Sequence, residues 1–143
     1  MNKNENVKSQ KEKKGDNNTI ISLYTLTENV DLVFERKGDT KEFNEFYLKE
    51  LEDYVEKYLK NSITKTQMRN IFDTFKDCNS NDKMKLLKPK LMYFAGRINK
   101  NDAKKFIEQL IKLIDAMRDE SDYKQLQKLV ETILAYHKYY AKD

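Results

Sequence analysis

Six side chains between residues 65 and 97 could bind a polyanion through fixed positive charge and an aromatic ring. They are Lys65, Arg69, Lys76, Lys90, Tyr93 and Arg97. On a helical wheel the first three fall within roughly 40° of one another, and the last three follow i, i+3, i+7 spacing, so each triplet would share one helix face. Lysine and arginine bind phosphate groups, and a tyrosine ring can stack on a base or a ribose. The two triplets therefore predict contact with a nucleic acid.

The charge around these residues is concentrated rather than spread along the chain. Residues 60–100 contain ten Lys or Arg and three Asp or Glu, whereas the whole chain has a net charge of only +4. A local excess of this kind favours a polyanionic partner. Two other interpretations stay open at this point. Lysine-rich helix faces are often solvated surface, with Tyr93 packed at the core margin, and an acidic protein could also bind here.

The residues that common catalytic and metal sites need are scarce. The chain has one histidine, His137, one cysteine, Cys78, and three isolated glycines. It therefore lacks a Cys/His zinc cluster and a Gly-rich phosphate loop. His137 falls on an apolar helical stripe, which is typical of a packed side chain. These observations favour a protein that is not an enzyme and has no catalytic residues, metal, cofactor or small-molecule substrate.

Carboxylates one helical turn apart are the weakest candidate site. Glu52 and Glu56 form one such pair, and Asp115 and Asp119 form another. Either spacing could hold a divalent cation, so a nuclease that uses Glu52, Glu56 or Asp119 is the last of the alternatives. Nearby lysines indicate that solvated helix faces explain both pairs better.

The composition is typical of a helical protein of one domain. The chain has 143 residues, of which 36% are charged, with three Gly and one Pro. Few helix breakers and many Lys, Glu, Leu and Ile predict an all-α fold. No run approaches the ~18 apolar residues that a membrane span needs, and no signal-peptide hydrophobic region is present. A single cysteine cannot form an internal disulfide, so we expect a cytoplasmic protein that does not bind a membrane.

Hydrophobic periodicity predicts a compact bundle of about five helices with a flexible N-terminal tail. Residues 1–19 are almost entirely polar and predict a disordered tail, and residues 20–143 predict a single helical domain. The segment 20–34 fits either a short helix or an extended strap that ends at Lys37-Gly38-Asp39. Longer helices are expected at about 42–60, from the Thr64 cap to a loop at 79–82, at 83–98, at 102–118 and from the Ser121 cap to Tyr140.

Two of these helices have distinctive local signals. Thr64 and Gln67 have the spacing of a capping box, with Ile63 and Met68 at the positions of the hydrophobic staple. Pro89 lies inside the apolar pattern of 83–98. It indicates either a kinked helix or the first turn of a helix that starts near Lys88.

The two basic segments also resemble the paired motifs of one protein family. The run Ile63-Thr-Lys-Thr-Gln-Met-Arg-Asn-Ile-Phe-Asp73 and the run Leu87-Lys-Pro-Lys-Leu-Met-Tyr-Phe-Ala-Gly-Arg97 are similar to the small subunit of the type III-A CRISPR effector, the Csm complex. That family has a Thr-Ser-Gln-Ile-Arg-like helix start and then Lys-Pro-Lys-Leu-Ala-Tyr-Ala-Ala-Gly-Arg. The resemblance extends more loosely over residues 40–143 and does not include residues 1–40.

The departures from the family pattern are mild. This chain has Lys65-Thr66 where Thr-Ser is usual, and Met92 and Phe94 where alanine is common. The residues that keep the pattern are the ones that could bind RNA: Arg69, Lys90, Tyr93 and Arg97.

The resemblance implies a non-catalytic, helical, RNA-binding structural subunit of an antiviral ribonucleoprotein. Such subunits stack in more than one copy beside other effector subunits, and they contact the backbone of the guide RNA and target RNA without reading sequence. By position, Arg69, Lys90 and Arg97 are the best candidates for RNA contact, with Lys65 and Lys76 in support. The alternatives are a stand-alone helical nucleic-acid binder, including the small subunit of type III-B complexes, and a helical adaptor that binds an acidic protein.

Overall fold

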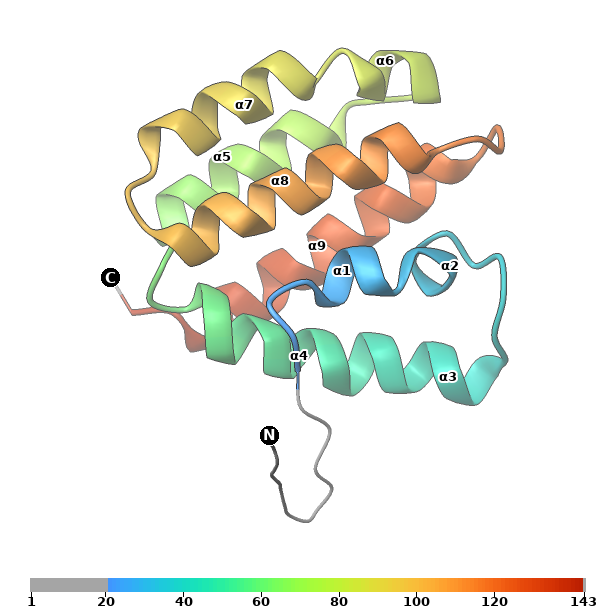
Figure 1. Cartoon of the computed structure of the whole chain (residues 1–143), viewed down its shortest axis with the longest axis horizontal. Coiled ribbons are helices and arrows are strands. Elements are labelled where there is room, and N and C mark those ends of the chain that lie inside the picture. Colours follow the sequence, from blue (N-terminus) through green and yellow to red (C-terminus); the bar gives the residue numbers. More distant parts are fainter. Residues whose placement is uncertain (1–20, 143) are drawn as a thin grey trace, which may run out of the picture.

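The computed structural model describes residues 21–142, and every regular element within that range is helical (Figure 1). This confirms the predicted all-α fold. The predicted tail, 1–19, lies outside the described residues, as do the two ends of the predicted domain, residues 20 and 143. The elements are α1 (Thr25–Glu28), α2 (Val30–Val33), α3 (Thr40–Glu45), η1 (Phe46–Glu50), α4 (Leu51–Tyr54), η2 (Val55–Leu59), α5 (Lys65–Lys76), α6 (Asn81–Lys85), α7 (Lys88–Arg97), α8 (Asn101–Ala116) and α9 (Asp122–Tyr140).

The segment from Thr40 to Leu59 is one continuous helical rod, because the backbone stays helical at each junction between α3, η1, α4 and η2. η1 and η2 are π-helical turns, which no sequence pattern predicted. Asp39 begins the rod with a capping box: its side chain accepts a hydrogen bond from the Glu42 amide, and the Glu42 side chain accepts one from the Asp39 amide. The predicted helix over 42–60 is thereby confirmed.

The central element is α9, which packs against α5, against the rod and against α8, while α7 lies along α8 (Figure 1). Counting the rod once, the described residues form five long helices and three short ones, which confirms the predicted bundle. His137 of α9 is fully buried, and its Nε2 lies 2.8 Å from the carbonyl oxygen of Ile63. It is thus the packed side chain that the apolar stripe predicted.

The apolar pattern over 83–98 does not form one helix. It is divided into α6 and α7, and Pro89 lies in the first turn of α7, where a missing backbone N–H costs no hydrogen bond. Of the two interpretations of Pro89, the second is correct. Between the two helices Leu86 is 76% exposed, whereas Met84 and Leu91 on either side of it are fully buried. The predicted loop at 79–82 is also shorter than expected, because Ser80 caps α6.

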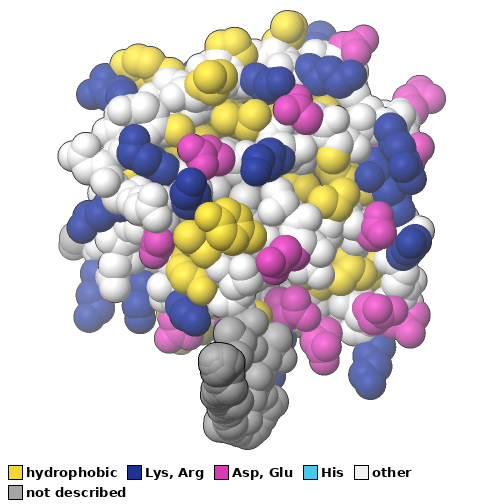
Figure 2. Space-filling model, viewed as in Figure 1, with side chains coloured by type: hydrophobic (Ala, Val, Ile, Leu, Met, Phe, Trp, Pro, Cys, Tyr) yellow, Lys and Arg dark blue, Asp and Glu magenta, His cyan; other side chains and the backbone are white. Residues whose placement is uncertain are grey.

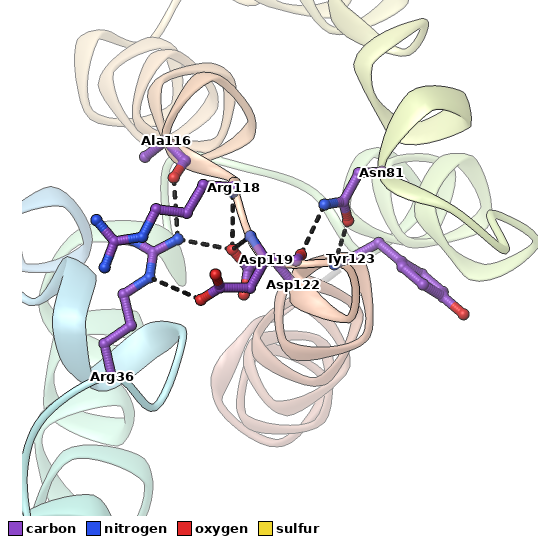
Figure 3. Close-up of polar contacts among 7 residues, drawn as sticks. All are labelled: Arg36, Asn81, Ala116, Arg118, Asp119, Asp122 and Tyr123. Carbon is purple, nitrogen blue, oxygen red and sulfur yellow. Dashed lines mark hydrogen bonds and ion pairs between the residues drawn. The ribbon is translucent and has the colours of Figure 1, made fainter.

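The turn between α8 and α9 is held by a carboxylate rather than by the predicted cap at Ser121. Ser121 occupies the N-cap position but makes no side-chain hydrogen bond there. Instead, Asp122 Oδ2 accepts hydrogen bonds from the backbone amides of Arg118 and Asp119, at 2.9 and 3.0 Å. The same oxygen lies 2.6 Å from Nη2 of Arg36, which reaches the turn from the N-terminal segment (Figure 3). The prediction of a Ser121 side-chain cap is wrong, because the side-chain acceptor at the first turn of α9 is Asn81 Oδ1, which accepts from the Tyr123 amide at 2.9 Å (Figure 3).

The N-terminal segment, left open between a helix and a strap, forms the two short helices α1 and α2. Long-range side-chain contacts hold the backbone at the start of this segment. The Tyr58 hydroxyl donates to the Ile21 carbonyl at 2.7 Å, and Nε2 of the buried Gln109 donates to the Leu23 carbonyl at 2.7 Å. Gly38, in the left-handed region with φ of 112°, turns the chain from α2 toward the rod.

Candidate nucleic-acid interface

The orientation of α5 is fixed at its first turn. The capping box predicted from the sequence is present: Thr64 Oγ1 accepts from the Gln67 amide at 3.0 Å, and Gln67 Oε1 accepts from the Thr64 amide at 2.9 Å. On the opposite side, Met68, Ile71 and Phe75 are buried against the bundle. These two constraints leave Arg69 exposed on the outer side of α5.

A first groove, the α5–α9 groove, contains two of the six predicted residues. It has a volume of about 250 Å³ and is lined by Lys65, Thr66, Arg69, Leu134, His137 and Lys138. The Arg69 guanidinium lies 5.7 Å from the centroid of the Phe72 ring, so a neutral aromatic side chain holds it near the groove. Lys76, predicted in the same stripe, does not line the groove, and its Nζ lies 3.4 Å from a carboxylate oxygen of Asp73.

A second groove, the α5–α7 groove, contains two more of the six predicted residues, Tyr93 and Arg97. It has a volume of about 300 Å³ and is lined by Gln67, Asn70, Ile71, Tyr93, Phe94, Arg97 and Ile98. Arg97 Nη1 donates a hydrogen bond of 2.7 Å to the Tyr93 hydroxyl, and the Tyr93 ring is 58% exposed. Lys90 is not among the residues that line this groove, but its Nζ lies 6.0 Å from the ring centroid of Phe94, which does line it. Tyr93 and Arg97 are therefore in contact, and Lys90, exposed on the same helix, stays a predicted member of this stripe.

A third hollow, the end pocket, adjoins the second. It has a volume of about 340 Å³, and its lining residues include Gln67, Arg97 and Ile98, which also line the α5–α7 groove. Four cations from three segments of the chain line it: Lys60, Arg97 with Lys100, and Lys142. Its other lining residues are Asn61, Ser62, Ile63, Thr64 and Asn99, so none of the described residues that form the pocket wall is a carboxylate.

The first predicted stripe lies on α5 itself and the second lies on α7. The α5–α9 groove borders one flank of α5, and the α5–α7 groove borders the other. Among residues 21–142, the three hollows are together lined by seven Lys or Arg side chains and by no Asp or Glu. A positive lining of this kind suits a chain of phosphates, because cations that contact phosphates release counterions, although Lys60 Nζ also lies 4.0 Å from a carboxylate oxygen of Glu56.

Several lining residues were missed by sequence reasoning. Lys138 belongs to α9, and no local pattern connects it with Arg69 on α5. Gln67 and Asn70 are uncharged, so a search for positive charge passed over them. Lys60 and Lys100 were counted in the basic stretch 60–100, but only the fold shows that they converge.

Negative charge gathers on a different part of the molecule. Figure 2 shows Asp and Glu side chains along the lower edge of the drawn face, where the rod from α3 to η2 lies. Partial burial and the neighbouring Glu45 and Asp53 carboxylates raise the pKa of Glu50. Partial burial likewise raises the pKa of Asp53, although Lys49 acts in the opposite direction. The acidic rod and the basic hollows around α5 give the molecule two electrostatically distinct surfaces.

The weaker candidate residues have structural contacts of their own. The Tyr140 hydroxyl donates to a Glu52 carboxylate oxygen at 2.5 Å, and Lys88 Nζ lies 2.8 Å from Asp115. Within residues 21–142, no three His, Cys, Asp or Glu side chains converge in a way that could hold a metal ion. Burial, followed by the nearby Asp77 carboxylate, raises the pKa of the Cys78 thiol, which disfavours a reactive thiolate.

No helix among the described residues is long and apolar enough to cross a lipid bilayer.

Comparison with known proteins identifies a family. The family model described as "Csm2 Type III-A" matches residues 47–143, which is more than half of the chain. The match includes every element from η1 to α9 except the first residue of η1, and all six predicted site residues. No curated protein and no solved structure matches the chain at a significant level.

Proposed function

The chain belongs to the Csm2 family of type III-A CRISPR effector subunits, and from this premise we propose that it is the RNA-binding structural subunit that lines the guide-RNA/target-RNA channel. Family membership implies assembly with the other subunits of the Csm complex. The proposal has three further parts. The subunit is not catalytic, it lies beside further copies of itself, and it contacts the backbone of guide and target RNA.

One observation carries the proposal. In the part of the chain that the structure describes, seven Lys or Arg side chains and no Asp or Glu line the hollows on both flanks of α5. Other cations of the described residues lie closer to carboxylates: Lys128 lies 3.3 Å from Glu35 and Lys88 lies 2.8 Å from Asp115, whereas Lys60 of the end pocket lies 4.0 Å from Glu56. Surface cations that face an open groove without carboxylates are the ones that can neutralise phosphates.

The mechanism follows from the kinds of side chain. Arg69 and Arg97 carry permanent charge, and each is held beside an aromatic ring rather than a carboxylate. A guanidinium held in this way can donate two parallel hydrogen bonds to one phosphate. Such contacts recognise ribose-phosphate and not base identity, so sequence specificity would come from pairing between the guide and the target.

The test measures RNA affinity of the assembled Csm complex as a function of salt. With Arg69→Ala and Arg97→Ala together, we expect weaker binding and a slope of log affinity against log salt that is shallower by about 1.4, since each lost contact to single-stranded RNA removes about 0.7. The control is Lys37→Ala with Lys128→Ala, which also removes two charges but near Asp31 and Glu35. An unchanged slope in the Arg69/Arg97 variant would show that the hollows around α5 do not bind RNA.

A second measurement addresses catalysis. The purified subunit is incubated with RNA and Mg²⁺ or Mn²⁺, and we expect the RNA to remain intact. Metal-dependent degradation that copurifies with the subunit and disappears in Glu52→Gln would contradict the non-catalytic assignment and revive the nuclease alternative.

A further inference from the structure

The α5–α7 groove contains more than a backbone clamp requires. Its floor is apolar: Ile71 is 1% exposed, Ile98 is 5% exposed, and Phe94 is half-buried against the core. A phosphate gains nothing from an apolar floor, because it binds through charge and hydrogen bonds. A flat apolar surface bordered by an exposed tyrosine ring is instead what a nucleobase needs for stacking.

The upper walls of the groove supply polar edges that suit a base. Asn70 and Gln67 both line it from α5, one helical turn apart. The Oε1 atom of Gln67 is engaged in the cap of α5, so the atom of this amide that remains for a ligand is the Nε2 amino group. Carboxamides offer a donor and an acceptor side by side, which is the arrangement that base edges match.

The end pocket supplies the partner of such a base. It adjoins the groove through Gln67, Arg97 and Ile98, which line both hollows. Arg97 stands at this junction and is fixed there by its 2.7 Å hydrogen bond to Tyr93. The apolar groove and the cationic pocket thus lie next to each other. A nucleotide could therefore place its base in the groove and a phosphate in the pocket.

From this juxtaposition we propose that the α5–α7 groove binds one unpaired base of an RNA strand, with a phosphate of the same strand in the end pocket held by Lys60, Lys100 and Lys142. The inference rests on the proposed function and extends it from backbone contact to capture of a base. RNA is the occupant that the charges favour over an apolar protein segment, because four cations and no carboxylate line the adjoining pocket.

The discriminating probe is an abasic RNA. Binding of the full-length chain is measured by fluorescence anisotropy with a 12-nucleotide uridine RNA and with the same RNA in which alternate bases are removed. Both strands carry the same phosphates. We expect the intact strand to bind about fivefold more tightly, the fold-change of one stacked base at the lower end of its usual contribution.

Two variants divide the site into its parts. Asn70→Ala should bring the intact and abasic strands toward equal affinity and leave the salt slope unchanged, and Asn44→Ala, an exposed asparagine on the rod, is the matched control. Lys100→Ala with Lys142→Ala should instead lower the salt slope, by about 0.7 for the phosphate that they hold, and leave the ratio of affinities unchanged. Thermal unfolding of each variant checks that the fold is retained.

The outcomes that would overturn the inference are distinct from failure of the proposed function. If intact and abasic strands bind equally well and the salt slope is that of phosphate contacts, the groove holds no base while the RNA-binding role stands. If neither strand binds, both proposals are wrong. If Asn70→Ala leaves the affinity ratio unchanged but prevents assembly with the other Csm subunits, the groove is a protein interface.

Discussion

Two arginines mark two regions of this molecule that use the same chemistry in opposite ways. The Arg36 side chain is 10% exposed and donates to the carboxylate of Asp122, whose side chain is 3% exposed, and to the carbonyl of Ala116 (Figure 3). Arg97 is exposed, and its hydrogen-bond partner is the neutral hydroxyl of Tyr93. The first guanidinium is compensated inside the fold, and the second keeps its full charge at the surface.

The comparison teaches which positive charges can serve a partner. Net charge counts Arg36 and Arg97 equally, yet only Arg97 can approach a phosphate without first losing an internal carboxylate. The family match agrees with this division, since it begins at Tyr47 and so includes Arg97 but not Arg36. The N-terminal segment secures the α8–α9 turn, and the hollows around α5 present charge outward.

The largest expected effect concerns the buried pair. Asp122→Ala removes the only carboxylate within 3 Å of the Arg36 guanidinium among the described residues, together with the acceptor for two backbone amides. Breaking a buried pair by removing one partner typically costs about 3–5 kcal/mol, because the other charge stays buried. We expect a loss of this size in the free energy of unfolding, measured by urea denaturation.

Asp119 is the matched control for that prediction. Its carboxylate lies 3.8 Å from Arg36 Nε, but its side chain is 63% exposed. Exposed pairs contribute about 0–1 kcal/mol, so Asp119→Ala should cost far less than Asp122→Ala. Equal losses in the two variants would mean that Arg36 is not committed to Asp122, and the contrast with Arg97 would fail.

The parts of the fold that could be predicted from the sequence are those that depend on residues close to one another along the chain. The capping box of Thr64 and Gln67 spans three residues, and both of its hydrogen bonds are present. Pro89 gave only two alternatives, because Met84, Leu91 and Ile98 fall on one helical arc whether or not the chain breaks between them. The exposure of Leu86 at the break distinguishes the two alternatives. That exposure depends on how α6 and α7 pack on the rest of the bundle, which the local sequence does not contain.

The parts that could not be predicted depend on long-range contacts. Arg36 and Asp122 are 86 positions apart, so no local pattern connects them, and Ser121 was the only visible cap for α9. The candidate site divides in the same way. The pairing of Tyr93 with Arg97 follows from i, i+4 spacing on one helix, whereas Lys138 and Asn70 join the grooves only through the packing of α5 against its neighbours.

The second prediction compares the effect of replacing one glycine by alanine in each of the two regions. Gly38, beside the Arg36 segment, has φ of 112°, and a Cβ there would lie 2.8 Å from Leu32 Cδ2. Gly96, beside Arg97 on α7, has no atom within 4 Å of an added Cβ apart from its own helix backbone and chain neighbours. Because glycine costs about 0.5–1 kcal/mol relative to alanine inside a helix, Gly96→Ala should stabilise the protein by up to that amount.

Gly38→Ala should have the opposite sign, with a loss of more than about 1 kcal/mol, since alanine is strained at that φ and meets Leu32. Both changes are measured as shifts of the urea midpoint at constant m-value. A destabilised Gly96→Ala variant would indicate that the outer side of α7 is packed more tightly than its exposure implies.

The smallest expected effect is the most informative about function. Arg97→Ala removes an exposed side chain whose hydrogen bond ends on an exposed tyrosine, and surface changes of this kind usually alter stability by less than about 0.5 kcal/mol. The same variant should weaken RNA binding and lower its salt slope, since the charge faces a groove without carboxylates. Arg36→Ala should do the reverse, with a large loss of stability and an unchanged salt slope in whatever protein remains folded. If Arg97→Ala also destabilised the fold by several kcal/mol, any loss of RNA affinity would reflect unfolding, and the division between inward and outward arginines would not hold.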